Sequence, residues 1–151
     1  AITVTMIYRG LSTVTTWFKV LRLSSLLMIT ITMIVYIIIL APDANPQSWN
    51  IYTNLLLHYI TPPVTIIVWL IFGPRKWINW SIVFKSLLIP IIYIIYTLIR
   101  GAIINKYPFG FINVVELGYA GALIGIGLVF SLGLFLLSVY FVIEKIISRS
   151  T

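Results

Sequence analysis

The sequence predicts an all-α polytopic membrane protein, a bundle of about four transmembrane helices. Two observations support this prediction. Of 151 residues, 61% are hydrophobic and only 9% are charged, and the mean hydropathy is +1.11, whereas a soluble domain is about 45–50% apolar and about 25% charged. The apolar residues also form four runs, each long enough to cross the roughly 30 Å hydrocarbon core of a bilayer. We therefore expect one transmembrane domain over residues 1–151.

The four runs cover residues 23–41, 51–72, 77–99 and 118–143. None of them alternates apolar and polar residues as a barrel strand does, in spite of the many Ile and Val residues. Each run is followed by residues that commonly end a helix, namely Pro42, Gly73-Pro74, Arg100-Gly101 and Glu144-Lys145.

Prolines and glycines inside the runs predict how the helices bend and pack. Pro62-Pro63 in the second run and Pro90 in the third should each free a backbone carbonyl one turn back and bend the helix. Gly121 and Gly125 are four residues apart in the fourth run, a spacing that favours close helix packing in lipid. A ligand site at these glycines is the alternative.

The positions of the basic residues predict the orientation of the helices. Residues near the N-terminus, in the turn at 73–76 and near the C-terminus supply Arg9, Lys19, Arg22, Arg75, Lys76, Lys145 and Arg149. The segment 42–50 has no base, and in 101–117 Lys106 is offset by an acid. By the positive-inside rule, both termini should face the cytoplasm, and these two loops should lie outside the plasma membrane. The net charge of +7 thus indicates membrane topology and not nucleic-acid binding.

His58, the only histidine, is the main candidate for catalysis. It lies in the second run, roughly 10 Å deep at about 1.5 Å per residue, where a titratable group is costly without partners or water. Asn54 precedes it by one helical turn, so both side chains project from one face. We expect His58 to act as a general base and Asn54 to orient it or bind an oxyanion. The alternative is a structural histidine that is hydrogen-bonded across helices.

A second polar group is expected at the outer ends of the third and fourth helices. Arg100, Tyr107 and Glu116 are predicted to bind substrate there, with Arg100 holding a lipid headgroup or a carboxylate. An ion-pair clamp between Arg100 and Glu116 is the alternative. The aromatic loop 106–111 lies between them and could cap a cavity. With no cysteine, one histidine and three acids, the chain is expected to hold neither a metal nor a cofactor.

Several motifs occur together along the chain. They are Thr32-x-x-x-Tyr36, Asn54-x-x-x-His58 before Thr61-Pro62-Pro63, Pro90-Ile91-Ile92-Tyr93 with Arg100-Gly101, Tyr107-Pro108-Phe109, and Gly118-Tyr119. From about residue 22 onward the chain resembles the bacterial Pr-six-Pr membrane family, which is similar to the androgen-induced, FAR-seventeen-a-like membrane proteins of eukaryotes.

The resemblance implies a bundle of about six helices. It also implies relatives that are threonine hydrolases of fatty acid esters of hydroxy fatty acids. In those relatives a helix histidine, which His58 matches, partners a threonine on an earlier helix, and no residue here matches that threonine. Because the chain starts at Ala1 with no initiator Met, we expect a fragment whose first helices are missing. A processed N-terminus is the alternative.

Three functions remain open at this point. The first is a lipid ester hydrolase with His58 as its general base. The second is a non-catalytic membrane protein that binds a lipid or a partner through Arg100, Tyr107 and Glu116. The third is a small transporter, which has less support because the chain shows neither repeated halves nor a series of intramembrane acids. Membrane lipids are the expected partners, and the oligomeric state is left open.

Overall fold

The computed structural model describes residues 15–73 and 76–149, and the regular structure in those residues is all helical. Four helices are long and apolar enough to cross a membrane, which confirms the predicted all-α fold. The spans are α2 (Thr16–Val35) with η2 (Tyr36–Leu40); α3 (Trp49–Asn54) with η4 (Leu55–Ile60) and α4 (Thr61–Phe72); α5 (Trp80–Ser86) with α6 (Leu88–Ile104); and α7 (Val114–Ile147). The short helices η3 (Ala41–Asp43) and η5 (Gly110–Ile112) lie in the loops.

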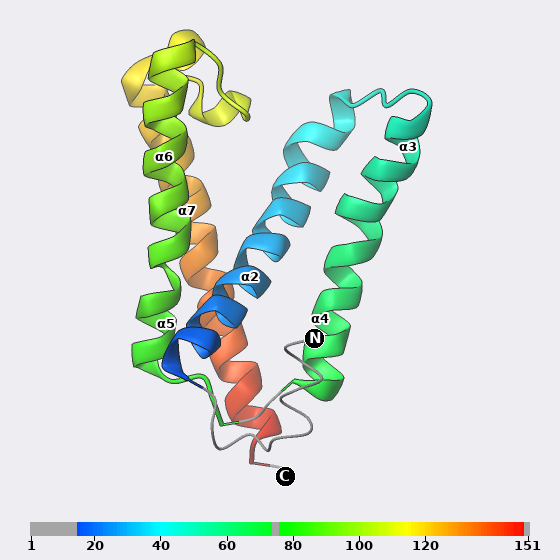
Figure 1. Cartoon of the computed structure of the whole chain (residues 1–151), viewed down its shortest axis with the longest axis vertical. Helices are drawn as coiled ribbons and strands as arrows, with labels where there is room; N and C mark the ends of the chain where they lie inside the picture. The colour runs from blue at the N-terminus through cyan, green and yellow to red at the C-terminus, as the bar shows by residue number, and fades with distance from the viewer. Residues whose placement is uncertain (1–14, 74–75, 150–151) are drawn as a thin grey trace.

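The four spans run alternately in opposite directions, as Figure 1 shows. The start of α2, the end of α4, the start of α5 and the end of α7 lie together at one end, which we call the turn end. The loops 41–48 and 105–113 lie at the opposite end, which we call the loop end. The start of the first span and the end of the last span therefore lie on the same side, as the distribution of basic residues predicts. Arg9 and Arg75, which contributed to that prediction, are outside the described residues.

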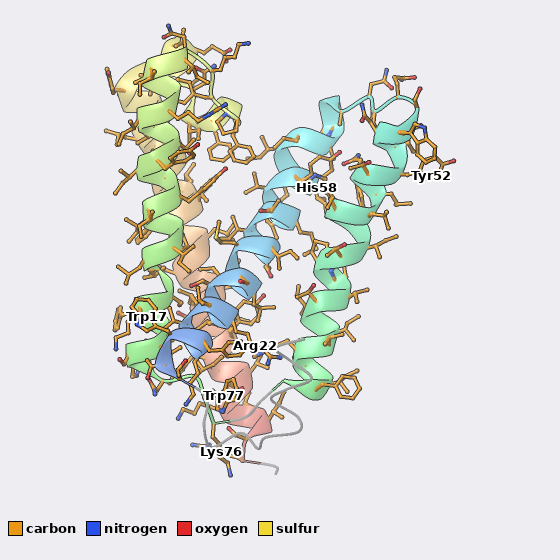
Figure 2. The ribbon with its side chains drawn as sticks, in the orientation of Figure 1. Trp17, Arg22, Tyr52, His58, Lys76 and Trp77 are labelled. Atoms are coloured by element: carbon orange, nitrogen blue, oxygen red, sulfur yellow. The ribbon has the colours of Figure 1, made fainter. Side chains whose placement is uncertain are left out.

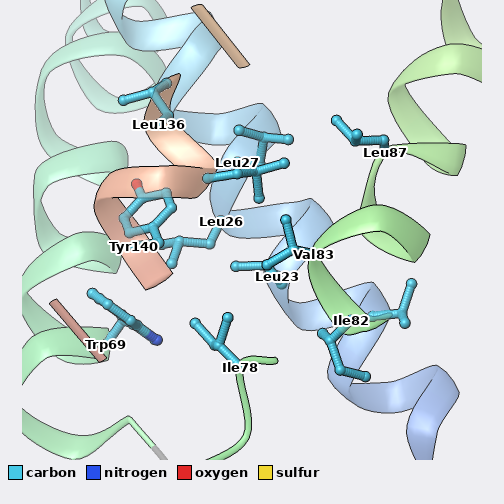
Figure 3. Packing of buried hydrophobic residues seen from close by; sticks show 12 residues of the cluster. Leu23, Leu26, Leu27, Trp69, Ile78, Ile82, Val83, Leu87, Leu136 and Tyr140 are labelled. Atoms are coloured by element: carbon cyan, nitrogen blue, oxygen red, sulfur yellow. The ribbon is translucent and has the colours of Figure 1, made fainter. Parts of the chain in front are cut away.

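The buried apolar core is at the turn end, where all four spans contribute to one cluster (Figure 3). Helix α2 is central to it, because α2 contacts α4, α5 and α7. In lipid such packing stabilises mainly through van der Waals contact, since the surroundings are as apolar as the core. The labelled members of the cluster are Leu23, Leu26, Leu27, Trp69, Ile78, Ile82, Val83, Leu87, Leu136 and Tyr140.

The first span begins at Thr16, earlier than the predicted start at residue 23. Two contacts explain the extension. Val20 is fully buried in the core, and the Lys19 ammonium lies over the Trp77 ring, 5.4 Å from its centroid, a cation–π arrangement. The basic stretch is thus part of the helix and packs against the connection that follows α4.

The third span does not end at Arg100-Gly101, so that prediction is wrong. Helix α6 continues to Ile104 and ends at Asn105, which has left-handed backbone angles (φ 54°, ψ 32°) of the kind common at helix ends. Gly101 is buried, and a Cβ added there would overlap the Tyr107 ring. The glycine therefore provides space for an aromatic ring and does not terminate the helix.

The fourth span is longer than predicted at both ends. Helix α7 begins at Val114, four residues before the predicted start. The Asn113 side chain caps it by accepting a hydrogen bond from the Val115 amide (3.1 Å). At the other end Glu144 does not stop the helix. It is 1% exposed, and its Oε1 accepts a hydrogen bond from the Trp77 amide at 3.0 Å. Glu144 thus ties α7 to the segment before α5.

Gly125 packs against η5, in the loop that precedes α7. A Cβ added to Gly125 would overlap the carbonyl of Phe111. The small side chain at this position therefore lets η5 lie directly on α7. Gly118 has φ 66° and ψ 173°, and it kinks the helix after its first turn.

Candidate functional site

The His58 ring lies flat against the Tyr36 ring at the loop end. The ring centroids are 3.8 Å apart and the planes differ by 6°. Figure 2 shows His58 between the first and second spans. Tyr36 is 8% exposed, so this pair fills the space between the two helices. The Tyr59 ring meets Tyr36 edge-on, with centroids 5.9 Å apart.

Both rings belong to π-helical segments, Tyr36 to η2 and His58 to η4. π-helical turns are rare and occur often at functional sites. Each segment ends two residues before a proline. Ala41, before Pro42, donates its amide proton to the Tyr36 carbonyl, and Thr61, before Pro62, donates to the Leu56 carbonyl.

These bonds have a steric cause. A proline lacks an amide proton, and its ring clashes with the carbonyl four residues earlier. The residue before each proline here bonds five residues back, which widens the turn. The prolines thus determine the local register in which Tyr36 and His58 are presented.

A cavity of about 440 Å³ lies between α2 and the α6–α7 pair. We call it the apolar cavity. Phe109 and Phe111 of the 106–111 loop line it, in agreement with the expectation that this loop caps a cavity. Residues from all four spans or their loops form its wall, among them Ile31, Tyr36, His58, Ile94, Phe111 and Ile126. Two threonines, Thr32 and Thr97, also line it.

A second, more open depression of about 430 Å³ lies on the other side of the Tyr36–His58 pair. We call it the amide groove, because its wall holds Asn45, Asn50 and Asn54 beside Thr53. It is formed by the 44–46 loop and the first turns of the second span. Tyr36 and His58 line both spaces.

The structure brings Asn54 and His58 together along one side of the groove, as their spacing predicts. The Nδ1 atom of His58 is buried, and within the described residues it has no hydrogen-bond partner. The alternative of a histidine hydrogen-bonded across helices through Nδ1 is therefore not observed. The imidazole itself lines both the apolar cavity and the amide groove.

The other predicted site residues do not converge. Arg100 and Glu116 are exposed, on α6 and in the first turn of α7, and no ion pair joins these two described residues. Tyr107 packs against Gly101. None of the three lines the apolar cavity or the amide groove.

No protein-family model, curated protein or solved structure matches this chain. The site is therefore interpreted from its own geometry. Among the described residues no three His, Asp or Glu side chains are grouped so as to hold a metal ion.

Sequence reasoning missed the role of Tyr36 in the site. The sequence did carry a signal for Tyr36. Thr32 and Tyr36 are one turn apart, and the number of residues from Tyr36 to Pro42 equals the number from Leu56 to Pro62. What it lacked was the pairing of the two spans, which brings the rings together.

Proposed function

We propose that this protein holds the acyl chain of a membrane lipid in the apolar cavity, with the polar end of the lipid beside His58. The observation that carries the proposal is a cavity of about 440 Å³ in the apolar part of the spans, with an imidazole at its wall. Its volume lies in the range of about 300–1,000 Å³ found for small-molecule sites. Lipid acyl chains are the most abundant apolar groups around such a helix bundle, and in the cavity they gain close van der Waals contacts.

The same proposal places the chain in the plasma membrane, with the turn end in the cytoplasm and the loop end outside. The turn end carries Lys19 and Arg22 near the start of α2, Lys76 before α5 and Lys145 near the end of α7, beside one acid, Glu144. The loop end has Arg100 and Lys106 but also Glu116. This asymmetry supports the orientation, because basic residues are retained on the cytoplasmic side.

Hydrolysis of a lipid ester is a second candidate, favoured by the position of the His58 imidazole at the wall of both spaces. His58 would take the proton of an attacking hydroxyl and return it to the leaving alkoxide, which forms an acyl-enzyme and releases the alcohol. A water molecule, deprotonated by His58 in the same way, would then release the fatty acid and restore the hydroxyl. The resemblance of Asn54, His58 and the Tyr107-Pro108-Phe109 motif to the Pr-six-Pr family supports this role. Thr32 lines the same cavity as His58 and is the hydroxyl of this chain that we would test as a nucleophile.

The lipid-binding proposal is tested by filling the cavity. Ile126→Trp adds an indole to the cavity wall, whereas Ile124→Trp, two residues away, alters a side chain that is 66% exposed and does not line the cavity. Native mass spectrometry after detergent exchange measures the retained lipid. We expect Ile126→Trp to lose bound lipid and Ile124→Trp to keep it. Equal retention in both variants would contradict the proposal.

The hydrolase candidate is tested separately. Ester hydrolysis is followed in nanodiscs with a fatty acid ester of a hydroxy fatty acid as substrate. We expect turnover to be lost in His58→Gln and Thr32→Val and kept in Thr65→Val, whose hydroxyl bonds to its own helix. Unchanged turnover in His58→Gln would remove His58 as the general base. Absence of turnover in the unaltered protein would leave a non-catalytic lipid-binding protein.

A further inference from the structure

The apolar cavity and the amide groove share one boundary, the stacked rings of Tyr36 and His58. One space faces α6 and α7 and is walled mainly by aliphatic and aromatic side chains. The other is open and is formed by the loop between the first two spans and the start of α3. An apolar and a polar space that meet at one point match the two parts of a lipid molecule, its chains and its headgroup.

The chemistry of the groove specifies the kind of headgroup. Its polar side chains are the amides of Asn45, Asn50 and Asn54 and the hydroxyl of Thr53. The Asn45 Oδ1 accepts a bond from Gln47 (2.8 Å), and Thr53 bonds to the Trp49 carbonyl. In the described part of the chain the side chains of Asn50 and Asn54 make no hydrogen bond. Each amide offers two donor hydrogens and an acceptor oxygen, so both can bind a group that donates and accepts.

A charged headgroup is not expected in this groove. No charged side chain is among the described residues that line it. Phosphate recognition in proteins usually depends on arginine or lysine. The described bases of the loop end, Arg100 and Lys106, line neither space.

From these observations we infer that the ligand is a neutral glycerolipid whose headgroup carries free hydroxyls, such as a diacylglycerol. Its hydroxyl lies in the amide groove against Asn50 and Asn54, and one of its chains lies in the apolar cavity. The ester linkage between the two lies against the Tyr36–His58 rings. This inference rests on the proposed function and adds the headgroup class to it.

The test is a competition between three lipids with identical chains, namely dioleoylglycerol, dioleoylphosphatidylglycerol and dioleoylphosphatidylcholine. The protein in detergent is given equal amounts, and native mass spectrometry measures which lipid is retained. We expect dioleoylglycerol to be preferred. Asn50→Leu and Asn54→Leu should each reduce that preference by about fivefold, the equivalent of one neutral hydrogen bond.

Controls separate a lost headgroup contact from a misfolded protein. Asn50 is exposed in the first turn of α3, so its replacement leaves the packing intact. Asn54→Gln keeps an amide and should keep most of the preference. Thr65→Val removes a hydroxyl from the same span, but Thr65 lines neither the apolar cavity nor the amide groove. This substitution should leave the lipid preference unchanged.

The outcomes distinguish the two proposals. If the three lipids are retained equally while Ile126→Trp still expels them, the headgroup inference is overturned and the acyl-chain proposal stands. Preference for the phosphatidylglycerol would also overturn the inference. If Ile126→Trp expels none of the lipids, the proposed function itself is wrong and the inference falls with it.

Discussion

At the scale of single residues, the site depends on a ring pair that shields the only histidine of the chain. Tyr36 covers one face of His58 at a centroid distance of 3.8 Å. Because no second histidine competes, a histidine-selective acylating reagent reports on this position alone. The reactivity of His58 is therefore a direct measure of how well the pair is packed.

We predict that Tyr36→Ala increases the rate at which diethyl pyrocarbonate modifies His58. The reason is steric, since the substitution uncovers one face of the imidazole. The rate is followed by the absorbance of the N-acylated imidazole. Tyr52→Ala is the matched control, because Tyr52 is 61% exposed and its ring meets Trp49 instead, at an interplanar angle of 53°. Equal rates in the two variants would show that Tyr36 does not shield the ring.

Gly101 supports the site loop through a close contact with Tyr107. A Cβ at Gly101 would overlap the ring, whereas a Cβ at Gly127 would meet nothing within 4 Å. We predict that Gly101→Ala destabilises the protein by about 1–3 kcal/mol through overpacking. Gly127→Ala should be neutral or stabilise by up to about 1 kcal/mol, because alanine favours the helix. Thermal unfolding in detergent distinguishes them, and equal midpoints would contradict this contact.

At the scale of helices, prolines determine where backbone carbonyls become available. Pro90 cannot donate to the Ser86 carbonyl four residues earlier. That carbonyl instead accepts a hydrogen bond from the Ser24 hydroxyl of α2, at 2.8 Å and fully buried. The bend in the third span and its attachment to α2 thus have one cause. The sequence predicts the freed carbonyl, but not that Ser24 supplies its donor.

We predict that Ser24→Ala destabilises the protein less when Pro90 is also replaced by alanine. In Pro90→Ala the restored amide bonds to Ser86 within the helix, so the Ser24 hydroxyl is no longer needed. A double-mutant cycle in detergent should give a coupling of about 0.5–1.5 kcal/mol, as for other hydrogen bonds between membrane helices. Strictly additive effects would contradict this account. A control cycle combines Thr65→Val with Pro90→Ala and should show no coupling.

At the scale of the whole molecule, tight packing and open space lie at opposite ends. The core joins all four spans at the turn end. At the loop end, the first two spans and the last two are separated by the apolar cavity. Firm packing at one end can hold the helices in place, so a space for a ligand is kept at the other.

The orientation can be tested with a single label, because the natural chain has no cysteine. Gln47→Cys places a thiol in the loop 41–48, and Arg149→Cys places one beyond the end of α7. In intact cells we predict that a membrane-impermeant maleimide labels the first variant and not the second. After permeabilisation both should react. The reverse labelling pattern would show that the topology is inverted, and the amide groove would then not lie on the outer side of the membrane.

The sequence by itself determined that the helices suit a lipid environment, how many spans there are and that they alternate in direction. These properties follow from hydropathy summed over about 20 residues and from the positions of charges. The sequence also identified His58 and Asn54, because polar and ionisable side chains are rare in transmembrane helices. It identified the helix-bending prolines, because proline has no backbone amide proton to donate. Only the tertiary structure decided that Tyr36 stacks on His58, that Gly101 accommodates Tyr107, and that Arg100 and Glu116 stand apart. Those outcomes depend on how helices and loops pack against one another, and local periodicity does not specify that packing.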